Sequence, residues 1–179
     1  MFQKVELRLS GSGGQGVILA AIILADAAIE QGLNAIQTQS YGPEARGGAS
    51  KSEVIINKDE IKFPKVTECD ILLCLTQNSY DKYVASLSNN GILVVDEGVN
   101  VDMNVPYKIY KLPILDTAQN KIGTHMVSNI VSVGALYALI GEDVIHKDVM
   151  VNSIANRVPP VTINQNISAF EEGIKLIRG

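Results

Sequence analysis

The sequence predicts a three-layer α/β sandwich built on a mixed, mainly parallel sheet, in one domain that covers residues 1–179. Two observations lead to this fold class. Segments typical of strands alternate along the chain with longer segments typical of helices. One pair of neighbouring strands instead indicates a hairpin, which adds an antiparallel element. A length of 179 residues suits a single domain with a substantial core.

The first predicted unit is a strand, a glycine-rich turn and a helix. Val5–Leu9 alternates apolar and charged residues, which is typical of a strand. A glycine cluster follows between Gly11 and Gly16. Val17–Gln31 is apolar nearly all round, which predicts a buried helix, and Gly32 is well suited to end it.

The rest of the chain divides into further strands and helices. Asn34–Thr38 predicts a second strand, and Ser40–Gly48, with its proline and glycines, predicts a loop. Two adjacent segments predict a hairpin closed through residues 57–59: Lys51–Ile56 and Glu60–Phe63. Later strands are predicted over Asp70–Leu75, Ile92–Val95 (after a turn at residues 89–91) and Tyr107–Leu112. Later helices are predicted from the capping residue Thr76 to about Leu87, then over Lys121–Ile140, Val144–Arg157 and Gln165–Ile177.

Composition excludes several classes of function. Lys and Arg number 15 against 19 Asp and Glu, for a net charge of −4, so no basic surplus exists for nucleic acid. Hydrophobic residues make up 46% and charged residues 19%, which indicates that part of the surface is buried against another protein. The longest uncharged apolar segments are shorter than the ~20 residues of a membrane span. We therefore expect no membrane association.

Cysteine content argues against a metal or redox centre in this chain. Cys69 and Cys74 are the two cysteines, too few for an iron–sulfur cluster or a structural zinc site. We interpret both as small core residues. No secretory signal is recognisable at the N-terminus, so a cytoplasmic location is expected. No arrangement typical of a catalytic centre or a metal site is recognisable either.

The glycine cluster has the order of a phosphate-binding turn. Gly11-x-Gly13-x-x-Gly16 stands between a predicted strand and a predicted helix. Glycines let the backbone approach an anion closely, and the free N–H groups of the helix then point at it. The alternative is a tight strand-to-helix turn without a ligand. No acidic residue closes the second predicted strand, which argues against a nicotinamide dinucleotide.

The loop at residues 40–48 carries a second motif, Ser-Tyr-Gly-Pro-Glu-Ala-Arg-Gly-Gly. Arg46 offers a planar guanidinium suited to carboxylate or phosphate. A loop after the second strand is expected at the same edge of the sheet as the glycine-rich turn, so the two motifs could face one pocket. The alternative is that Glu44 and Arg46 only pair with each other or with neighbouring side chains.

Together the two motifs resemble those of the gamma subunits of 2-oxoacid:ferredoxin oxidoreductases, and the amino-acid sequence of the second motif favours the 2-oxoglutarate type. The resemblance implies a subunit that carries no catalytic residue and helps to bind coenzyme A (CoA). Pyruvate, branched-chain and indolepyruvate enzymes remain alternatives, as does a free-standing nucleotide-binding module. The residues that the resemblance places near CoA are Gly11, Ser12, Gly13, Gly14, Gln15, Gly16, Tyr41, Arg46 and Gly47.

The resemblance also implies the rest of the enzyme. Oxidative decarboxylation of the 2-oxoacid uses thiamine diphosphate, Mg²⁺ and iron–sulfur clusters on alpha, beta and ferredoxin-like delta subunits, with ferredoxin as a more distant partner. This chain would bind no cofactor by itself, and CoA would lie at a subunit interface. In isolation the chain is expected to be inactive and could form a homodimer through surfaces meant for its partners.

One polar stripe interrupts the predicted helix at Lys121–Ile140. His125, Asn129 and Ser132 share a face of this apolar segment. The stripe could line a pocket or a subunit contact. We favour the plainer interpretation, in which the amide and hydroxyl groups bond to nearby backbone.

Overall fold

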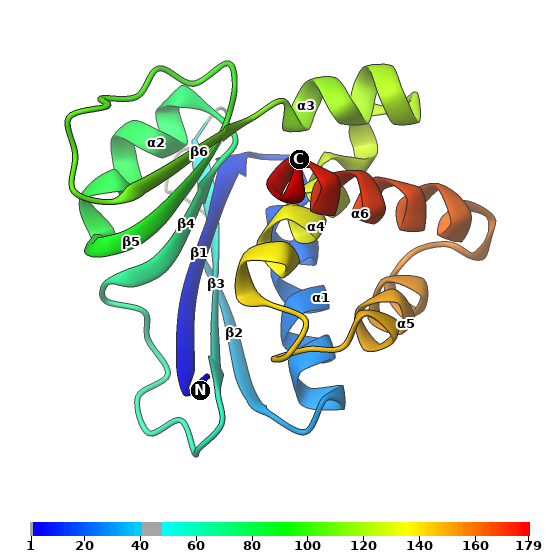
Figure 1. Cartoon of the computed structure of the whole chain (residues 1–179), viewed down its shortest axis with the longest axis horizontal. Coiled ribbons are helices and arrows are strands. Elements are labelled where there is room, and N and C mark those ends of the chain that lie inside the picture. The colour runs from blue at the N-terminus through cyan, green and yellow to red at the C-terminus, as the bar shows by residue number, and fades with distance from the viewer. Residues whose placement is uncertain (1, 41–47) are drawn as a thin grey trace.

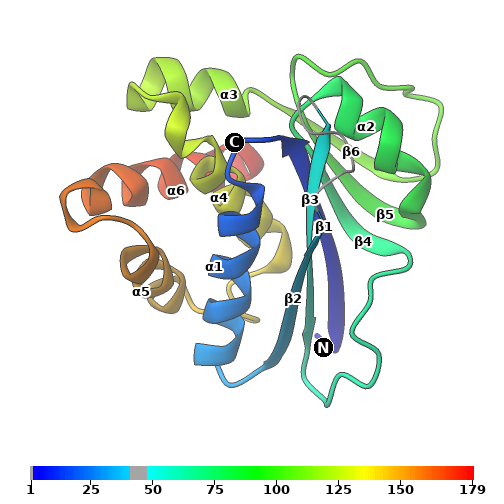
Figure 2. The same cartoon turned by 180° about the vertical axis from the view of Figure 1, so that it is seen from behind.

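The computed structural model describes residues 2–40 and 48–179, and it confirms the three-layer α/β sandwich (Figures 1 and 2). A six-stranded sheet of order β2-β3-β1-β4-β5-β6 forms the middle layer. β3 runs antiparallel to its neighbours β1 and β2, and the remaining pairs are parallel. The strands are β1 (Lys4–Ser12), β2 (Asn34–Ser40), β3 (Ala49–Asn57), β4 (Cys69–Cys74), β5 (Leu87–Asp96) and β6 (Lys108–Leu112).

Helices cover both faces of the sheet (Figure 1). One face carries α1 (Val17–Glu30), α4 (Ser128–Ile140), α5 (Lys147–Arg157) and α6 (Ile163–Arg178). The other carries α2 (Gln77–Tyr83), which Thr76 caps through a reciprocal pair of bonds with Ser79, as the sequence predicts for its start. The short α3 (Ile114–Asp116) continues as a π-helical turn over Thr117–Ile122. Two hydrophobic cores result, one on each face of the sheet.

The predicted hairpin at residues 51–63 is wrong, because its first strand, β3, pairs with other strands than the one predicted at residues 60–63. β3 pairs with β2 on one side and with β1 on the other. Both of its edges are therefore occupied, and residues 60–63 form no strand. β2 and β3 pair with each other antiparallel instead, and residues 41–48 stand between them in the sequence. The predicted turn at residues 89–91 is also wrong, because these residues lie inside β5.

The long helix predicted over Lys121–Ile140 is wrong as well. Gly123 takes a left-handed conformation with φ of 93° and ends the π-helical turn. The Thr124 side chain then accepts a hydrogen bond from the backbone of Met126, and a short 3₁₀ turn leads into α4. A stop residue followed at once by a capping residue therefore divides the segment. The helix predicted from Val144 begins only at Lys147. Val144 and Ile145 lie in the turn after α4, where both donate to the Gly141 carbonyl and are buried in the core.

A buried ion pair ties β1 to β3. Arg8 and Glu53 are 5% and 7% exposed, and the guanidinium and carboxylate meet at 2.6 Å. Arg8 also donates to the carbonyl of Val66 at 3.0 Å, and Lys51 donates to the same carboxylate at 2.8 Å. Burial alone would raise the pKa of Glu53, but the hydrogen bonds and charges of Lys51 and Arg8 outweigh it and lower the pKa below 4.5. The carboxylate is therefore charged and paired at neutral pH.

Candidate anion site at the glycine-rich turn

The glycine-rich turn connects the carboxyl end of β1 to the start of α1. Gly11 and Ser12 are the last residues of β1, because β3 pairs with them through Ser50 and Ala49. The strand thus continues three residues beyond the predicted end at Leu9, and it begins one residue earlier. Gly16 precedes α1 with φ of 72°, a left-handed conformation that favours glycine. The predicted order of strand, turn and helix is confirmed.

Gln15 braces this turn from within. Its side-chain Oε1 accepts a hydrogen bond from the backbone N–H of Ser12 at 2.7 Å. The backbone N–H of Gln15 in turn donates to the Ser12 carbonyl at 3.3 Å. A Cβ on Gly11 would collide with that same Oε1. The side chain of Gln15 therefore shapes the turn through its Oε1.

Gly13 and Gly14 form the open side of the turn. Both are exposed, and no described atom beyond their chain neighbours lies within 4 Å of the position that a Cβ would take. The start of α1 has no side-chain cap, and its first turn holds no acidic residue. Within the described residues no side chain caps the N–H groups at this helix start, so they and the positive end of the helix dipole are suited to bind an anion.

The loop that carries the second motif begins and ends beside this turn. Ala49, the first residue of β3, is the register partner of Ser12, and Ser40 at the end of β2 pairs with Lys51. The connection between β2 and β3 therefore starts and finishes at the carboxyl edge of β1, as predicted. Three predicted site residues of this loop lie outside the described residues: Tyr41, Arg46 and Gly47.

Asn129 joins α4 to the turn, and sequence reasoning did not connect the two. It is 5% exposed, and its Nδ2 donates to the carbonyl of Gly16 at 3.4 Å. A Cβ on Gly16 would lie 2.7 Å from that nitrogen. Its Oδ1 is buried and has no hydrogen-bond partner within residues 2–40 and 48–179, which costs about 1–3 kcal/mol. The neighbouring Ser132 bonds to the Ser128 carbonyl, as the plainer interpretation expected.

Cys69, Cys74 and Asp96 have structural roles. Burial raises the pKa of Cys69 to about 11 and that of Cys74 to about 12, so both thiols stay protonated. Asp96 accepts the backbone N–H groups of Gly98 and Leu115 and so fixes the turn after β5. Within the described part of the chain, no group of three or more His, Cys, Asp or Glu side chains could hold a metal ion. No helix there is long and apolar enough to cross a membrane.

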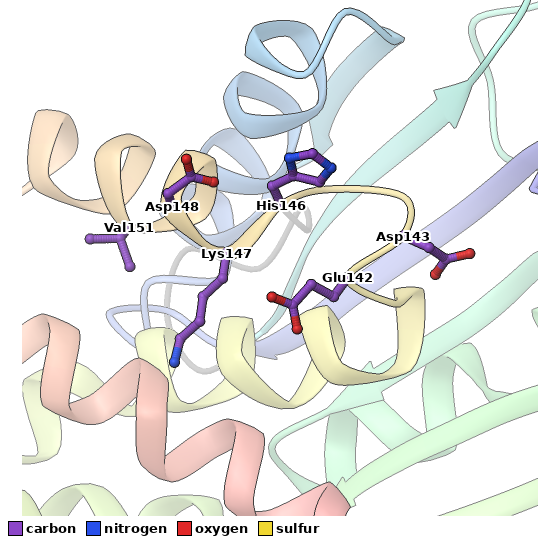
Figure 3. Close-up of a pocket in the computed structure, with 6 residues that line it drawn as sticks. All are labelled: Glu142, Asp143, His146, Lys147, Asp148 and Val151. Carbon is purple, nitrogen blue, oxygen red and sulfur yellow. The ribbon is translucent and has the colours of Figure 1, made fainter.

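A larger cavity of about 760 Å³ lies away from the turn (Figure 3). Its lining comes from the segment between α4 and α5 and from the start of α5, and the labelled carboxylates point in different directions. The backbone N–H of His146, in this segment, donates to Oε1 of Gln31 at 2.9 Å. Gln31 ends α1, at the opposite end of the helix from the glycine-rich turn. With 14 residues in α1, about 21 Å of helix separate the two places. This cavity is therefore not part of the anion site.

Fold and turn together define an α/β protein whose glycine-rich strand–turn–helix unit presents an open helix N-terminus at the sheet edge. The chain belongs to the pyruvate ferredoxin/flavodoxin oxidoreductase family, whose model matches residues 6–176. This confirms the resemblance that the two sequence motifs indicate.

Individual relatives are similar over nearly the whole chain. The 2-oxoglutarate synthase subunit KorC of Methanocaldococcus jannaschii is 46% identical over 98% of this chain and 95% of its own. The gamma subunit of a keto/oxoacid ferredoxin oxidoreductase from Geobacter sulfurreducens is 43% identical, with a TM-score of 0.85 over 97% of this chain and 98% of that one. Subunits named for ketoisovalerate and indolepyruvate oxidoreductases are less similar.

The same fold is found within a larger chain. The 2-oxoglutarate:ferredoxin oxidoreductase of Magnetococcus marinus, solved with 2-oxoglutarate, coenzyme A and succinyl-CoA bound, matches with a TM-score of 0.86 at 19% identity. The match covers 99% of this chain and 32% of that one. At this identity the likeness concerns the fold alone.

Proposed function

We propose that this chain is the gamma subunit of a 2-oxoglutarate:ferredoxin oxidoreductase. The enzyme would convert 2-oxoglutarate and CoA to succinyl-CoA and CO₂ and pass two electrons to ferredoxin. The observation that carries this proposal is the open glycine-rich turn at the start of α1, in a chain 46% identical to a 2-oxoglutarate synthase subunit. The gamma subunit would act as a single domain that completes the active site and helps to bind CoA.

The turn suits the phosphate groups of CoA. Gly13 and Gly14 are exposed, and no described atom beyond their chain neighbours lies within 4 Å of the position that a Cβ would take. The dipole of α1 stabilises negative charge at this point. Ser12 and Gly16 hold the turn at its two ends, and Gln15 braces it. We include Tyr41, Arg46 and Gly47 in the site, because their loop is anchored at Ser40 and Ala49 beside the turn.

We assign the redox chemistry to partner subunits. The chain has two cysteines, and both are buried in the core. Thiamine diphosphate, Mg²⁺ and iron–sulfur clusters would therefore be held by alpha, beta and ferredoxin-like delta subunits in the cytoplasm. Among the described residues, five large hydrophobic side chains are exposed and could contact such partners: Ile29, Phe63, Met103, Met126 and Val161. The chain alone would be inactive and would tend to self-associate.

Copurification tests the assembly. A tagged chain expressed with its natural neighbours should bring down a thiamine diphosphate-binding chain and a cluster-binding chain. The assembled enzyme should reduce ferredoxin when supplied with 2-oxoglutarate and CoA, faster than with pyruvate, ketoisovalerate or indolepyruvate. Recovery of the chain alone from native lysate at low and high salt would contradict the proposal. Tight binding of a mononucleotide without binding of CoA would favour the free-standing module instead.

Arg46→Ala tests the second motif. Loss of one charge-assisted hydrogen bond to a phosphate should weaken CoA binding by about 1–3 kcal/mol and raise the KM for CoA in the assembled enzyme. The KM for 2-oxoglutarate should stay unchanged, because the guanidinium is assigned to CoA. Arg46→Lys is the control and should recover part of the affinity. An unchanged KM for CoA would show that Arg46 serves only the loop.

A further inference from the structure

The outer edge of β2 is open within the described part of the chain. β2 stands first in the sheet order and pairs with β3, and no strand of residues 2–40 and 48–179 occupies its other side. In an edge strand, alternate residues turn their N–H and C=O groups outward. β2 therefore offers backbone hydrogen bonds to a further strand along its seven residues.

The two edges of the sheet differ in their protection against such pairing. Natural edge strands avoid it by being short or by carrying lysine, proline or a bulge. β6, at the other end of the sheet, has five residues and carries Lys108 and Lys111. β2 has seven residues with no charge and no proline, in unbroken register against β3. Of the two edges, β2 is therefore the one suited to pairing.

An apolar groove of about 380 Å³ lies at the edge of β2. Its lining includes Ile29 and Leu33 from the end of α1 and the turn after it, Ile36 of β2, and Ile61 from the segment after β3. Ile29 is 57% exposed, and Ile36 belongs to neither of the two hydrophobic cores. A strand that pairs with β2 would cover this apolar surface as well.

We propose that two copies of this chain pair through β2, antiparallel about a twofold axis, so that one sheet runs through both copies. This pairing goes beyond the proposed function and does not depend on it. A second copy fits the edge because antiparallel pairing about a twofold axis uses the same residues on both sides. Each copy then contributes the same uncharged strand and the same groove.

Charged residues beside the strand favour this arrangement. The twofold axis brings the Asn34 end of β2 against the Ser40 end of the second copy. Glu60 lines the groove near Asn34, and Lys51 is the register partner of Ser40 at the other end. Glu60 of each copy is therefore directed toward the end that carries Lys51 of the other, so opposite charges meet twice in the pair.

The contact has the size of a weak but specific interface. Seven strand residues span about 23 Å, and the layer on each face of the sheet widens the strip to about 20 Å. The two copies together then bury about 900 Å², close to the ~1,000 Å² that a specific interface needs. We therefore expect a dissociation constant on the order of 1–100 μM.

Pairing through β2 leaves the glycine-rich turn open. β1 and β2 run in the same direction, because both are antiparallel to β3. A twofold axis that reverses β2 also reverses β1, so the turns of the two copies lie at opposite ends of the shared sheet. Each copy can then bind its own partner subunits.

Sedimentation equilibrium of the full chain measures the pairing, and wild type should pass from monomer to dimer over the micromolar range. Ile36→Lys places a charge on the unprotected edge and should raise the dissociation constant by about tenfold or more. Met103→Lys is the matched control. Met103 is also an exposed apolar residue, at 70%, but it lies between β5 and β6 at the other end of the sheet. This variant should dimerise like wild type.

Hydrogen exchange of wild type gives a second measurement that does not depend on the folding of a variant. The outward amides of β2 should exchange about tenfold more slowly in the dimer than in the monomer, whereas β6 should exchange equally in both. A chain that stays monomeric up to about 1 mM, or a dimer whose β2 amides exchange at the monomer's rate, would overturn the pairing. A dimer of unchanged strength in folded Ile36→Lys would overturn it too. None of these results bears on the CoA site, which copurification and CoA binding test separately.

Discussion

Gly173→Ala is expected to destabilise the fold by about 3 kcal/mol or more, at the upper end of what overpacking costs. Gly173 of α6 faces Gly134 of α4 where the two helices cross. A Cβ on Gly173 would lie far inside contact distance of the Val131 carbonyl, and a Cβ on Gly134 would meet the Phe170 carbonyl in the same way. Because these obstacles are backbone atoms, a rotamer change cannot relieve them, and the helices must separate.

Chemical denaturation of the purified chain measures this effect. Gly13→Ala is the matched control, since Gly13 has neither a positive φ nor an obstructing atom within the described structure. Its unfolding free energy should stay within about 0.5 kcal/mol of wild type. Equal stability of Gly173→Ala and wild type would contradict the packing of α4 against α6. The ring contact between Tyr137 and Phe170, at 5.2 Å, should also loosen in Gly173→Ala.

Glu53→Ala is expected to cost about 3–5 kcal/mol at neutral pH, because it leaves the buried Arg8 guanidinium without its carboxylate. The effect depends on pH. The pKa of Glu53 is lowered below 4.5 in the folded protein, so its contribution to stability is present above pH 4.5 and disappears as the pH falls through the folded value. The unfolding free energies of wild type and Glu53→Ala should therefore converge in acid.

The double variant Arg8→Met with Glu53→Leu distinguishes the cost of an unpaired buried charge from the loss of the ion pair itself. Replacing both partners by apolar residues removes the unpaired charge, so this variant should be more stable than Glu53→Ala at pH 7. A gap between wild type and Glu53→Ala that does not change with pH would contradict the charged state assigned to Glu53. The pair also matters for the site, because it joins β1 and β3, which carry the turn and the end of the loop.

Local patterns along the chain predict the first unit of the fold well. The alternation at Val5–Leu9, the glycine cluster and the apolar helix at Val17–Gln31 depend on residues close in sequence, and the structure confirms each. Strand pairing is different, because it depends on which edge is free. The strand predicted over Lys51–Ile56 corresponds to β3, but its sequence cannot show that β2 and β1 occupy both of its edges.

The same distinction holds for the site. Glycine spacing predicts the turn, yet the contact between Gly16 and Asn129 joins residues 113 positions apart, and no local pattern indicates it. The polar stripe singled out Asn129 and Ser132, and one of them bonds within its own helix as expected. The close approach at Gly134 and Gly173 is equally invisible in sequence, because a glycine inside a helix does not reveal its neighbour.

The most direct test of the central claim is the CoA affinity of the Gly13→Asp variant in the assembled enzyme. A carboxylate at Gly13 has room, and it would occupy the helix N-terminus and repel phosphate. We predict that CoA binding weakens by about 30-fold or more, equivalent to about 2 kcal/mol, while the isosteric Gly13→Asn loses much less and both variants remain folded. Wild-type CoA affinity in a folded, assembled Gly13→Asp enzyme would contradict an anion site at this turn.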